Sequence, residues 1–487
     1  MLQQSDPQLM ILRRHMHIGD ERTLPSGWMW TTFGEILAAT YGKGLPERQR
    51  EKGSVPVFGS NGATGYHNTA LTSGETLIIG RKGSAGAVQY SQTACWTIDT
   101  TYFVDNFPAG LSPKYLFYLL CNQNLGQLDR STAIPSLSRD DLNSVDLPLA
   151  PRAEQHRIVA AIEQQFTRLD AGVAALKQAQ VRLQRYRASV LKAACEGKLV
   201  PQDPDDEPAS VLLQRILGER RAKWEAEQLE KLRDQGKMAL PEAIKAKYEE
   251  PKAPDSEGLL ALPKGWCWAC IDQVAENLDY KRVPVNNQER SKQIGIYPYF
   301  GANGLVGWIN DYLFDEPLIL VVEDETFTGR EKPFSYKITG KTWVNNHAHV
   351  LRATDVVNTD YLNYSLSFYP FTPLTTGTTG RKKLTQSALM SAPYALPPLS
   401  EQQRIVAEID RCLSVVEELE ATVEANLKRA ERLRQSILKQ AFEGKLVPQN
   451  PNDEPASVLL ERIRAERQSK GKDVDRHEQQ ALPEVTP

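Results

Sequence analysis

The chain has 487 residues, of which 41% are hydrophobic and 24% are charged, and its formal net charge is −3. This length is too great for one hydrophobic core and indicates two to four domains of an ordinary globular protein. No apolar run reaches the roughly 18–20 residues that a membrane-spanning helix needs. The slightly acidic balance counts against nucleic-acid binding unless basic side chains gather on one face.

Residues 1–23 contain only "LMIL" as an apolar core, which is too short for a signal peptide, so we expect a loose N-terminal extension. The cysteines lack framework spacing, which fits a reducing cytoplasm. "CWAC" (Cys267–Cys270) has the spacing of a thiol or zinc half-motif, but the matching segment of the first half reads "MWTT". A buried strand is the favoured interpretation.

Residues 24–151 form a first module of short strand-like runs broken by Gly, Asn and Pro. In "GRKGSAG", Arg81 and Lys82 stand between glycines that allow backbone N–H groups to approach an anion. Simple solvation of these basic side chains remains the alternative. Asn61, in "FGSNG", suits a tight turn as well as adenine recognition. The candidate DNA-binding residues of this module are Lys43, Asn61, Arg81, Lys82 and Ser84.

Residues 152–196 and 399–443 carry apolar side chains at alternating steps of four and three, which predicts two long coiled-coil helices. The chain must return along the second helix if the two pair, so we expect an antiparallel pair and a pseudo-two-fold arrangement. Arg187 and Arg434 interrupt the seam at equivalent steps, either extending their charge to the edge or setting the register. The seam positions are Ile162, Phe166, Leu169, Val173, Leu176, Leu183 and Val190, then Ile409, Leu413, Val416, Val423, Leu427 and Ile437.

Nearly the same sequence segment, which we call the repeated phrase, follows each of these helices. One copy lies in a connector (197–261) and the other in the C-terminal segment (444–487). Residues 195–216 and 442–463 agree at 18 of 22 positions. Gly197 and Gly444 suit left-handed helix caps. A short helix should follow each, the first with Val211, Leu212 and Ile216 on its buried face. We interpret the phrase as structural, and contact with a partner could coexist with that role.

Residues 262–398 form a second module that keeps "FGANG" but otherwise resembles the first only thinly. "TTGTTGRKKL" supplies a second basic, glycine-containing loop, whereas "VEDET" has no assigned role. His347 and His349 would share one face of a strand, but no nearby Cys or His completes a zinc set, so no metal site is expected. The candidate DNA-binding residues here are Asn303, Asn345, Thr379, Arg381, Lys382 and Lys383.

The duplication predicts an α+β protein in which two modules, each a mixture of helices and short strands, are separated by the long paired helices. The two long helices and the segments after them are similar in sequence, whereas the two modules differ. This suggests that the modules recognise different ligands and are held on one scaffold. We find no phosphate-binding loop, dinucleotide fingerprint, amino-methyltransferase motif or nuclease carboxylate cluster. The chain is therefore predicted to be non-catalytic.

The order of "LPSGW", "PVFGSNGATGY", "IIGRKGSAG", "LPLAPRAEQHRIV" and "EGKLVPQDPDDEPASVLL" resembles the DNA-specificity subunits of type I restriction–modification enzymes. "YPYFGANGLVGW", "WVNNHAHVL" and "ALPPLSEQQRIV" extend the resemblance to the second half. It implies a non-catalytic subunit whose two target-recognition domains each bind half of a split, asymmetric site in double-stranded DNA.

The resemblance also implies partners: two modification subunits, which carry S-adenosylmethionine and methylate adenine, and two restriction subunits. No cofactor is expected in this chain. The helical regions would act as spacer and docking surface, with Glu154, Arg157, Lys198, Glu401, Arg404 and Lys445 as candidate docking residues. The alternative is a coiled-coil scaffold whose modules bind protein or glycan. Basic glycine-rich loops favour DNA, whereas net acidity favours the scaffold.

Overall fold

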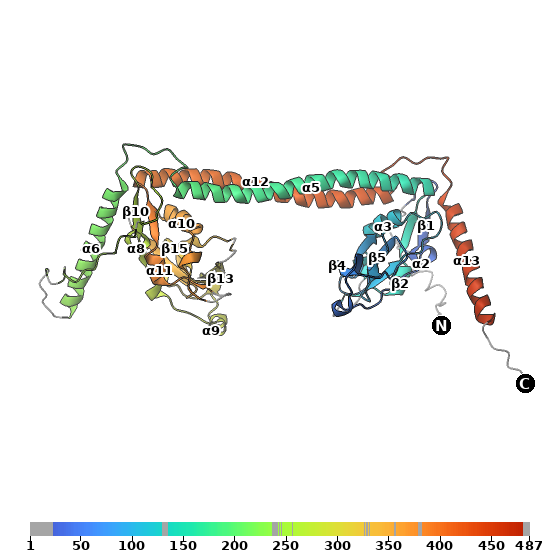
Figure 1. Cartoon of the computed structure of the whole chain (residues 1–487), viewed down its shortest axis with the longest axis horizontal. Coiled ribbons are helices and arrows are strands. Elements are labelled where there is room, and N and C mark those ends of the chain that lie inside the picture. Colours follow the sequence, from blue (N-terminus) through green and yellow to red (C-terminus); the bar gives the residue numbers. More distant parts are fainter. Residues whose placement is uncertain are drawn as a thin grey trace, which may run out of the picture. The chain divides into compact units, whose positions relative to one another are not determined.

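The computed structural model describes residues 23–480 apart from 129–134, 236–241, 243, 245, 256, 326, 328, 329, 331, 355, 356 and 378–381. The chain folds into two compact units (Figure 1). Unit 1 combines residues 1–176 with 425–487, and unit 2 comprises residues 177–424. Each unit therefore contains one module and a segment of both long helices.

The module of unit 1 consists of short helices and short strands. Its short helices are α2 (Phe33–Ile36), α3 (Pro113–Asn122) and α4 (Arg139–Asn143), with single 3-10 turns at Glu47–Gln49 and Leu125–Leu128. Its strands are β1 (Met29–Thr32), β2 (Thr40–Tyr41), β3 (Val55–Gly59), β4 (Gly62–His67), β5 (Thr76–Gly80), β6 (Val88–Ser91), β7 (Trp96–Thr97), β8 (Thr101–Val104) and β9 (Asp146–Leu149).

Unit 2 has its own set of elements. The helices are α6 (Ala209–Asp234), α8 (Ile271–Val274), α9 (Asn287–Lys292), α10 (Thr359–Ser367) and α11 (Gln386–Met390), with 3-10 turns at Asp279–Lys281 and Thr372–Leu374. The strands are β10 (Cys267–Cys270), β11 (Ala275–Asn277), β12 (Tyr297–Gly301), β13 (Gly304–Ile309), β14 (Phe314–Asp315), β15 (Leu318–Val322), β16 (Asp324–Glu325), β17 (Ser335–Ile338), β18 (Lys341–Val344), β19 (Ala348–Ala353), β20 (Lys382–Lys383) and β21 (Pro393–Leu396).

The two modules share one topology despite their divergent sequences. The pair β1–β9 corresponds to β10–β21, and the sheet β2-β8-β5-β6 corresponds to β11-β19-β15-β17. In the remaining sheet, β3 pairs antiparallel with β4 and parallel with β7, as β12 does with β13 and β18. Unit 2 adds β14, β16 and β20. "CWAC" forms strand β10 as predicted, and Cys270 is buried.

The long helices are α5 (Arg152–Cys195) and α12 (Leu399–Phe442), and each has 44 residues. Their predicted seam positions are buried or half-buried, while most other positions are exposed. Within unit 1, Ile158 and Ile162 of α5 share a core with Ile437 and Ala441 of α12. Each unit thus pairs an early segment of one helix with a late segment of the other, which confirms the antiparallel coiled coil (Figure 1).

The two arginines that interrupt the apolar seam lie at its edge, and each forms an ion pair with a carboxylate of the other long helix. In unit 2, Arg187 lies 3.3 Å from the carboxylate of Glu420. In unit 1, Arg434 forms an ion pair with Asp170 and covers the ring of Phe166 at 4.3 Å. The edge position and an interhelical contact are therefore both observed, and such charge pairs favour the correct register.

The repeated phrase caps both long helices as predicted. Gly197 and Gly444 have φ values of +64° and +67°, which glycine adopts without steric cost. The helices that follow are longer than expected: α6 has 26 residues and α13 (Ala456–Gln480) has 25. Leu212 and Ile216 are buried as predicted. The prediction for Val211 was wrong, because this side chain is 45% exposed beside the buried stripe.

Candidate nucleic-acid interface

The matched asparagines lie at the tips of two equivalent hairpins. Asn61 precedes Gly62 between β3 and β4, and Asn303 precedes Gly304 between β12 and β13. Both glycines have positive φ, at +123° and +103°, so both tips are tight turns. Both asparagines are exposed, and Asn303 accepts a hydrogen bond from Arg330 at 3.0 Å. The turn interpretation is confirmed, and the exposed amides remain candidates for base contacts.

An arginine–tyrosine cluster forms in unit 1. The guanidinium groups of Arg81 and Arg139 each lie 5.3 Å from the ring centre of Tyr41, which is exposed. Arg81 also donates to the backbone carbonyl of Asp99 at 2.8 Å and 3.1 Å, which fixes its plane. Two cations that share an exposed aromatic ring suit contacts with phosphates and base edges. Sequence reasoning missed Tyr41 and Arg139, although "SLSRDDL" offered Arg139 directly after a helix-capping serine.

Lys43 and Lys82 lie on neighbouring loops of the same module. The backbone N–H of Lys43 donates to Thr97, and that of Lys82 donates to Thr100. Both lysine side chains are exposed, whereas Ser84 is half-buried. We call Tyr41, Lys43, Arg81, Lys82 and Arg139 the unit 1 basic patch.

Four backbone amides of "GRKGSAG" are already paired within the fold, which leaves little of this loop's backbone for an anion. The amides of Arg81, Lys82, Gly83 and Gly86 all donate to backbone carbonyls of Thr100, Pro135 and Gly80. A satisfied amide has no hydrogen left for an anion. Any phosphate contact at this loop must therefore come mainly from side chains.

The basic loop of unit 2 is tied to the "VEDET" acids. Strand β20 pairs with β16, and the ammonium group of Lys383 lies 2.9 Å from the carboxylate of Glu323. Lys382 is half-buried. Thr379 and Arg381 lie outside the described residues. Lys383 therefore anchors the loop internally, while its side chain stays 57% exposed.

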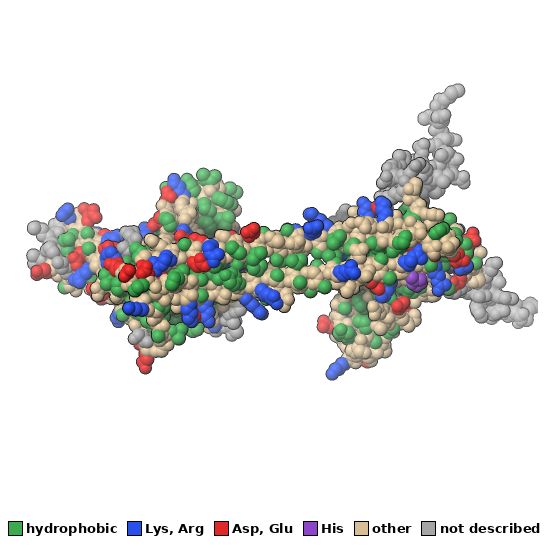
Figure 2. Space-filling view, turned by 90° about the horizontal axis from the view of Figure 1, so that it is seen from above, with side chains coloured by type: hydrophobic (Ala, Val, Ile, Leu, Met, Phe, Trp, Pro, Cys, Tyr) green, Lys and Arg blue, Asp and Glu red, His purple; other side chains and the backbone are tan. Residues whose placement is uncertain are grey.

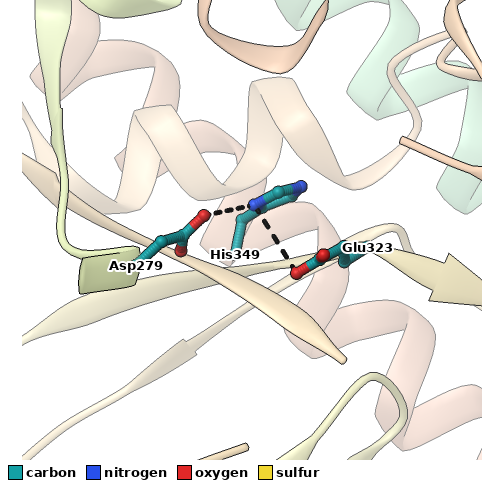
Figure 3. Close-up of side chains that lie close together, drawn as sticks. All are labelled: Asp279, Glu323 and His349. Carbon is teal, nitrogen blue, oxygen red and sulfur yellow. Dashed lines mark hydrogen bonds and ion pairs between the residues drawn. The ribbon is translucent and has the colours of Figure 1, made fainter. Parts of the chain in front are cut away.

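Three ionisable side chains lie together behind this loop (Figure 3). The Nδ1 atom of His349 lies 2.5 Å from Asp279 and 3.9 Å from Glu323. Its Nε2 atom lies 2.9 Å from the backbone carbonyl of Leu384. A carbonyl oxygen only accepts, so Nε2 carries a proton. His349 is buried and both of its ring nitrogens are engaged.

This group is a charge clamp and not a metal site. Its potential ligand atoms lie within 4.8 Å of one another, and it is the one such group among the residues that the structure describes. However, Arg282 binds both carboxylates, lying 3.3 Å from Asp279, and Lys383 binds Glu323. A divalent cation would displace these positive groups. His347 does not join the group: it lies in the turn before strand β19, is half-exposed and pairs with Asp324 at 2.6 Å, so the two histidines do not share a strand as expected.

The clamp makes unit 2 sensitive to acid. Burial raises the pKa of Glu323, but Arg282 and Lys383 outweigh it and hold the pKa below its ordinary value of 4.5. A carboxylate with a lowered folded-state pKa stabilises the fold above its unfolded pKa and loses that contribution as pH falls. We expect the unfolding free energy of unit 2 to decline below about pH 4.5. In urea titrations at several pH values, Glu323→Gln should reduce the loss of unfolding free energy as the pH falls. An unchanged pH dependence would exclude Glu323 as its source.

Asn303 and Asn345 both border one hollow of about 650 Å³ in unit 2. Arg290 and Tyr299 border it as well, and sequence reasoning missed both. The guanidinium of Arg290 lies 4.9 Å from the ring centre of Tyr299. The structure thus brings two predicted residues of this unit to one cavity.

The two glutamates predicted to dock a partner are buried and accept hydrogen bonds from side chains of their own module. Glu154 is 1% exposed and accepts a hydrogen bond from the indole of Trp28 at 3.0 Å. Glu401 is equally buried and accepts one from Trp266 at 3.0 Å. Burial raises the pKa of both carboxyl groups. The docking role assigned to these two glutamates was wrong, because each joins its long helix to the entry of its own module.

The other docking candidates remain accessible. Arg157 pairs with Asp453 at 2.6 Å, and Arg404 pairs with Asp206 at the same distance. Both arginine side chains are about one-third exposed, at 35% and 37%. Lys198 and Lys445 are more exposed, at 71% and 68%. These four residues remain candidates for partner contact.

Replacing either buried glutamate, Glu154 or Glu401, should destabilise the unit whose module it contacts. Glu401→Ala leaves the buried indole N–H of Trp266 without its acceptor, so we expect a loss of about 1–3 kcal/mol in unfolding free energy. Glu154→Ala should behave alike in unit 1. Lys198→Ala, at an exposed site, is the control and should change it by less than about 0.5 kcal/mol. Chemical denaturation measures all three, and equal values for Glu401→Ala and the control would contradict the fastening role.

Basic and acidic side chains are interspersed on the face that Figure 2 presents. This agrees with the balance within the modules, where residues 24–151 carry 9 basic and 10 acidic side chains and residues 262–398 carry 13 of each. Local clusters such as the unit 1 basic patch are therefore the features that could attract DNA.

A family model described as the type I restriction modification DNA specificity domain matches residues 25–178 and 263–429. The chain belongs to this family. Both matches begin at a module and continue into the long helix that follows it. The resemblance noted in the sequence motifs is confirmed.

Curated relatives extend the match across the chain. The Escherichia coli type I restriction enzyme EcoDI specificity subunit is 22% identical over 92% of this chain and 97% of its own length. The EcoBI specificity subunit of the same organism is 26% identical over 92% and 94%. A solved chain from work on complex assembly and conformational transition of the type I restriction–modification system has a TM-score of 0.55 at 18% identity, covering 87% of this chain and 99% of that one. This last likeness supports the fold.

Membership in the specificity family decides the class of protein. The chain is a DNA-recognition subunit of a type I system and not a catalytic one. The alternative of a scaffold for protein or glycan finds no support in these comparisons. Among the described residues, no helix is long and apolar enough to cross a membrane.

Proposed function

We propose that the chain recognises a bipartite, asymmetric target in double-stranded DNA, with one half read by each unit. The observation that carries this proposal is that two modules of one topology present different side chains on their surfaces. Unit 1 presents an arginine–tyrosine cluster, whereas unit 2 presents an amide-lined hollow. Two such modules suit two unlike base sequences, because side chains at base edges determine specificity.

The proposal includes partners. Two copies of nearly the same capping phrase and helix suit two copies of one partner, the adenine-methylating modification subunit, which would bring S-adenosylmethionine. Arg157, Arg404, Lys198 and Lys445 are the accessible candidates for this docking. Two restriction subunits would complete a cytoplasmic nuclease. Partners would also add phosphate contacts that the near-neutral modules lack.

Selection from random duplexes tests the proposal. The reconstituted complex of this chain with its modification subunit is mixed with a random duplex library, and bound DNA is sequenced. We expect a split motif with a spacer of fixed length, and methylation of an adenine in each half. Recovery of no motif above that obtained with the modification subunit alone would overturn the proposal.

A further inference from the structure

The hollow of unit 2 has the size of a small-molecule site. Its volume of about 650 Å³ lies in the range of pockets that enclose a small ligand. The hairpin β12–β13 and the segment after β18 border it, with Asn286, Asn303 and Asn345 supplying amides. Val285 and Val306 supply apolar walls.

Internal contacts hold the polar groups of this hollow in place. The backbone N–H of Asn345 donates to Phe300, and its side-chain oxygen accepts from the backbone of His347 at 2.8 Å. A Cβ atom at Gly301 would lie 2.7 Å from the Asn345 amide nitrogen, so only glycine leaves room for it. Arg290 lies close enough to the ring of Tyr299 for a cation–π contact.

These groups match the chemistry of a nucleobase. Amides donate and accept together, as the edges of bases do, and a guanidinium plane can stack on a base. The carboxylate that borders the hollow, Glu289, is turned to its own helix, because it accepts from the backbone of Asn286 in a capping box.

The β12–β13 hairpin that borders the hollow carries exposed apolar side chains. Leu305 is 53% exposed and Val306 is 49% exposed, directly after the Asn303–Gly304 tip. Exposure of large apolar groups on a hairpin tip is unfavourable in water. Proteins that kink DNA insert such side chains between base steps.

Unit 1 keeps the hairpin-tip asparagine, Asn61, and an arginine beside the matched glycine, since Arg50 lies near Gly65 as Arg290 lies near Gly307, but it differs at four other matched positions. Phe58 pairs with Ala63 where Phe300 pairs with Leu305, and Val57 pairs with Trp96 where Tyr299 pairs with Trp343. Ile98 donates to Phe58 where Asn345 donates to Phe300. Small or apolar side chains thus replace the wedge and the polar lining: Ala63 for Leu305, Thr64 for Val306, Val57 for Tyr299 and Ile98 for Asn345.

We propose that unit 2 opens one base step of its half-site, with Leu305 and Val306 entering the stack and the extruded base held in the hollow between Arg290 and the amides. This inference rests on the proposed DNA recognition and deepens it. The wedge fills the space that the base leaves, and the hollow replaces its lost stacking and hydrogen bonds. Unit 1 reads its half-site with the base pairs closed.

Fluorescent base analogues test the inference. In the reconstituted complex with the modification subunit, 2-aminopurine or pyrrolocytosine is placed at each position of the unit 2 half-site except the methylated adenine. We expect a fluorescence increase of about fivefold or more at one position, since unstacking relieves quenching. The double substitution Leu305→Ala and Val306→Thr, which copies unit 1, should reduce the increase to near that of free duplex.

Asn345→Ile copies the unit 1 residue within the hollow and should also lower the signal. If this buried change prevents folding, the exposed hairpin pair still supplies the test. No increase at any position, or an increase that the hairpin variant leaves unchanged, would overturn the inference. Recovery of the split motif by selection in the same complexes would then leave the proposed function standing, so the two failures are distinguishable.

Discussion

Replacing Arg81 and Arg139 with alanine should weaken binding to the target and relax base preference in one half-site alone. Each well-placed arginine contact to a guanine edge contributes about 1–3 kcal/mol, so the loss of two such contacts should lower the affinity about 30-fold or more. The effect should be confined to unit 1, because both guanidinium groups share the ring of Tyr41 within that module. Selection from random duplexes would then return one intact half-motif and one degenerate one.

The matched control is Arg215→Ala in α6, which removes an exposed arginine paired with Glu207 outside the modules. It should leave both half-motifs intact. Equal relaxation of both halves by the double substitution would contradict independent reading by the two units. A melting curve of each variant separates lost contacts from lost folding.

Inserting one heptad into both long helices should lengthen the spacer of the recognised motif. Seven helical residues add about 10 Å, which corresponds to about three base pairs at 3.4 Å each. The insertions follow Leu176 in α5 and Glu424 in α12, at the limits of the two compact units, so neither module is altered. A whole heptad keeps the apolar seam in register.

Insertion into α5 alone is the control. It leaves the seam of α12 one heptad short, and we expect lower stability and poor DNA binding. If the doubly inserted protein folds and selects the original spacer, the helices do not set the distance between half-sites. The half-motifs themselves should stay unchanged in either case, because the modules keep their own cores.

The scaffold was predictable because its signals are local and repeated. The seam of α5 and α12 follows from a heptad pattern, and the positive φ of Gly197 and Gly444 follows from their place after a helix. The exposed Val211 escaped prediction, because its neighbours in the fold decide where the buried stripe ends. The equal topology of the modules was hidden, since few residues beyond the FGxNG turns were kept alike.

The candidate site was predictable only in part. Lys43, Lys82, Asn61 and Asn303 are exposed as expected of contact residues. Glu154 and Glu401 were misassigned, because a charged residue in a repeated motif suggests a surface until a buried tryptophan is found to donate to it. The role of Glu323 in "VEDET" depends on Arg282 and His349, which the fold brings beside it from distant segments of the chain.

The sequence by itself determined the duplication, the long paired helices, their caps and the family, because each is written in contiguous residues or in a fixed period. Only the tertiary structure decided which polar groups meet. Tyr41 gathers Arg81 and Arg139, and the β12–β13 hairpin gathers Arg290 and Asn345, from segments far apart in the chain. Such contacts arise when sheets pair and loops converge, and no local pattern encodes them.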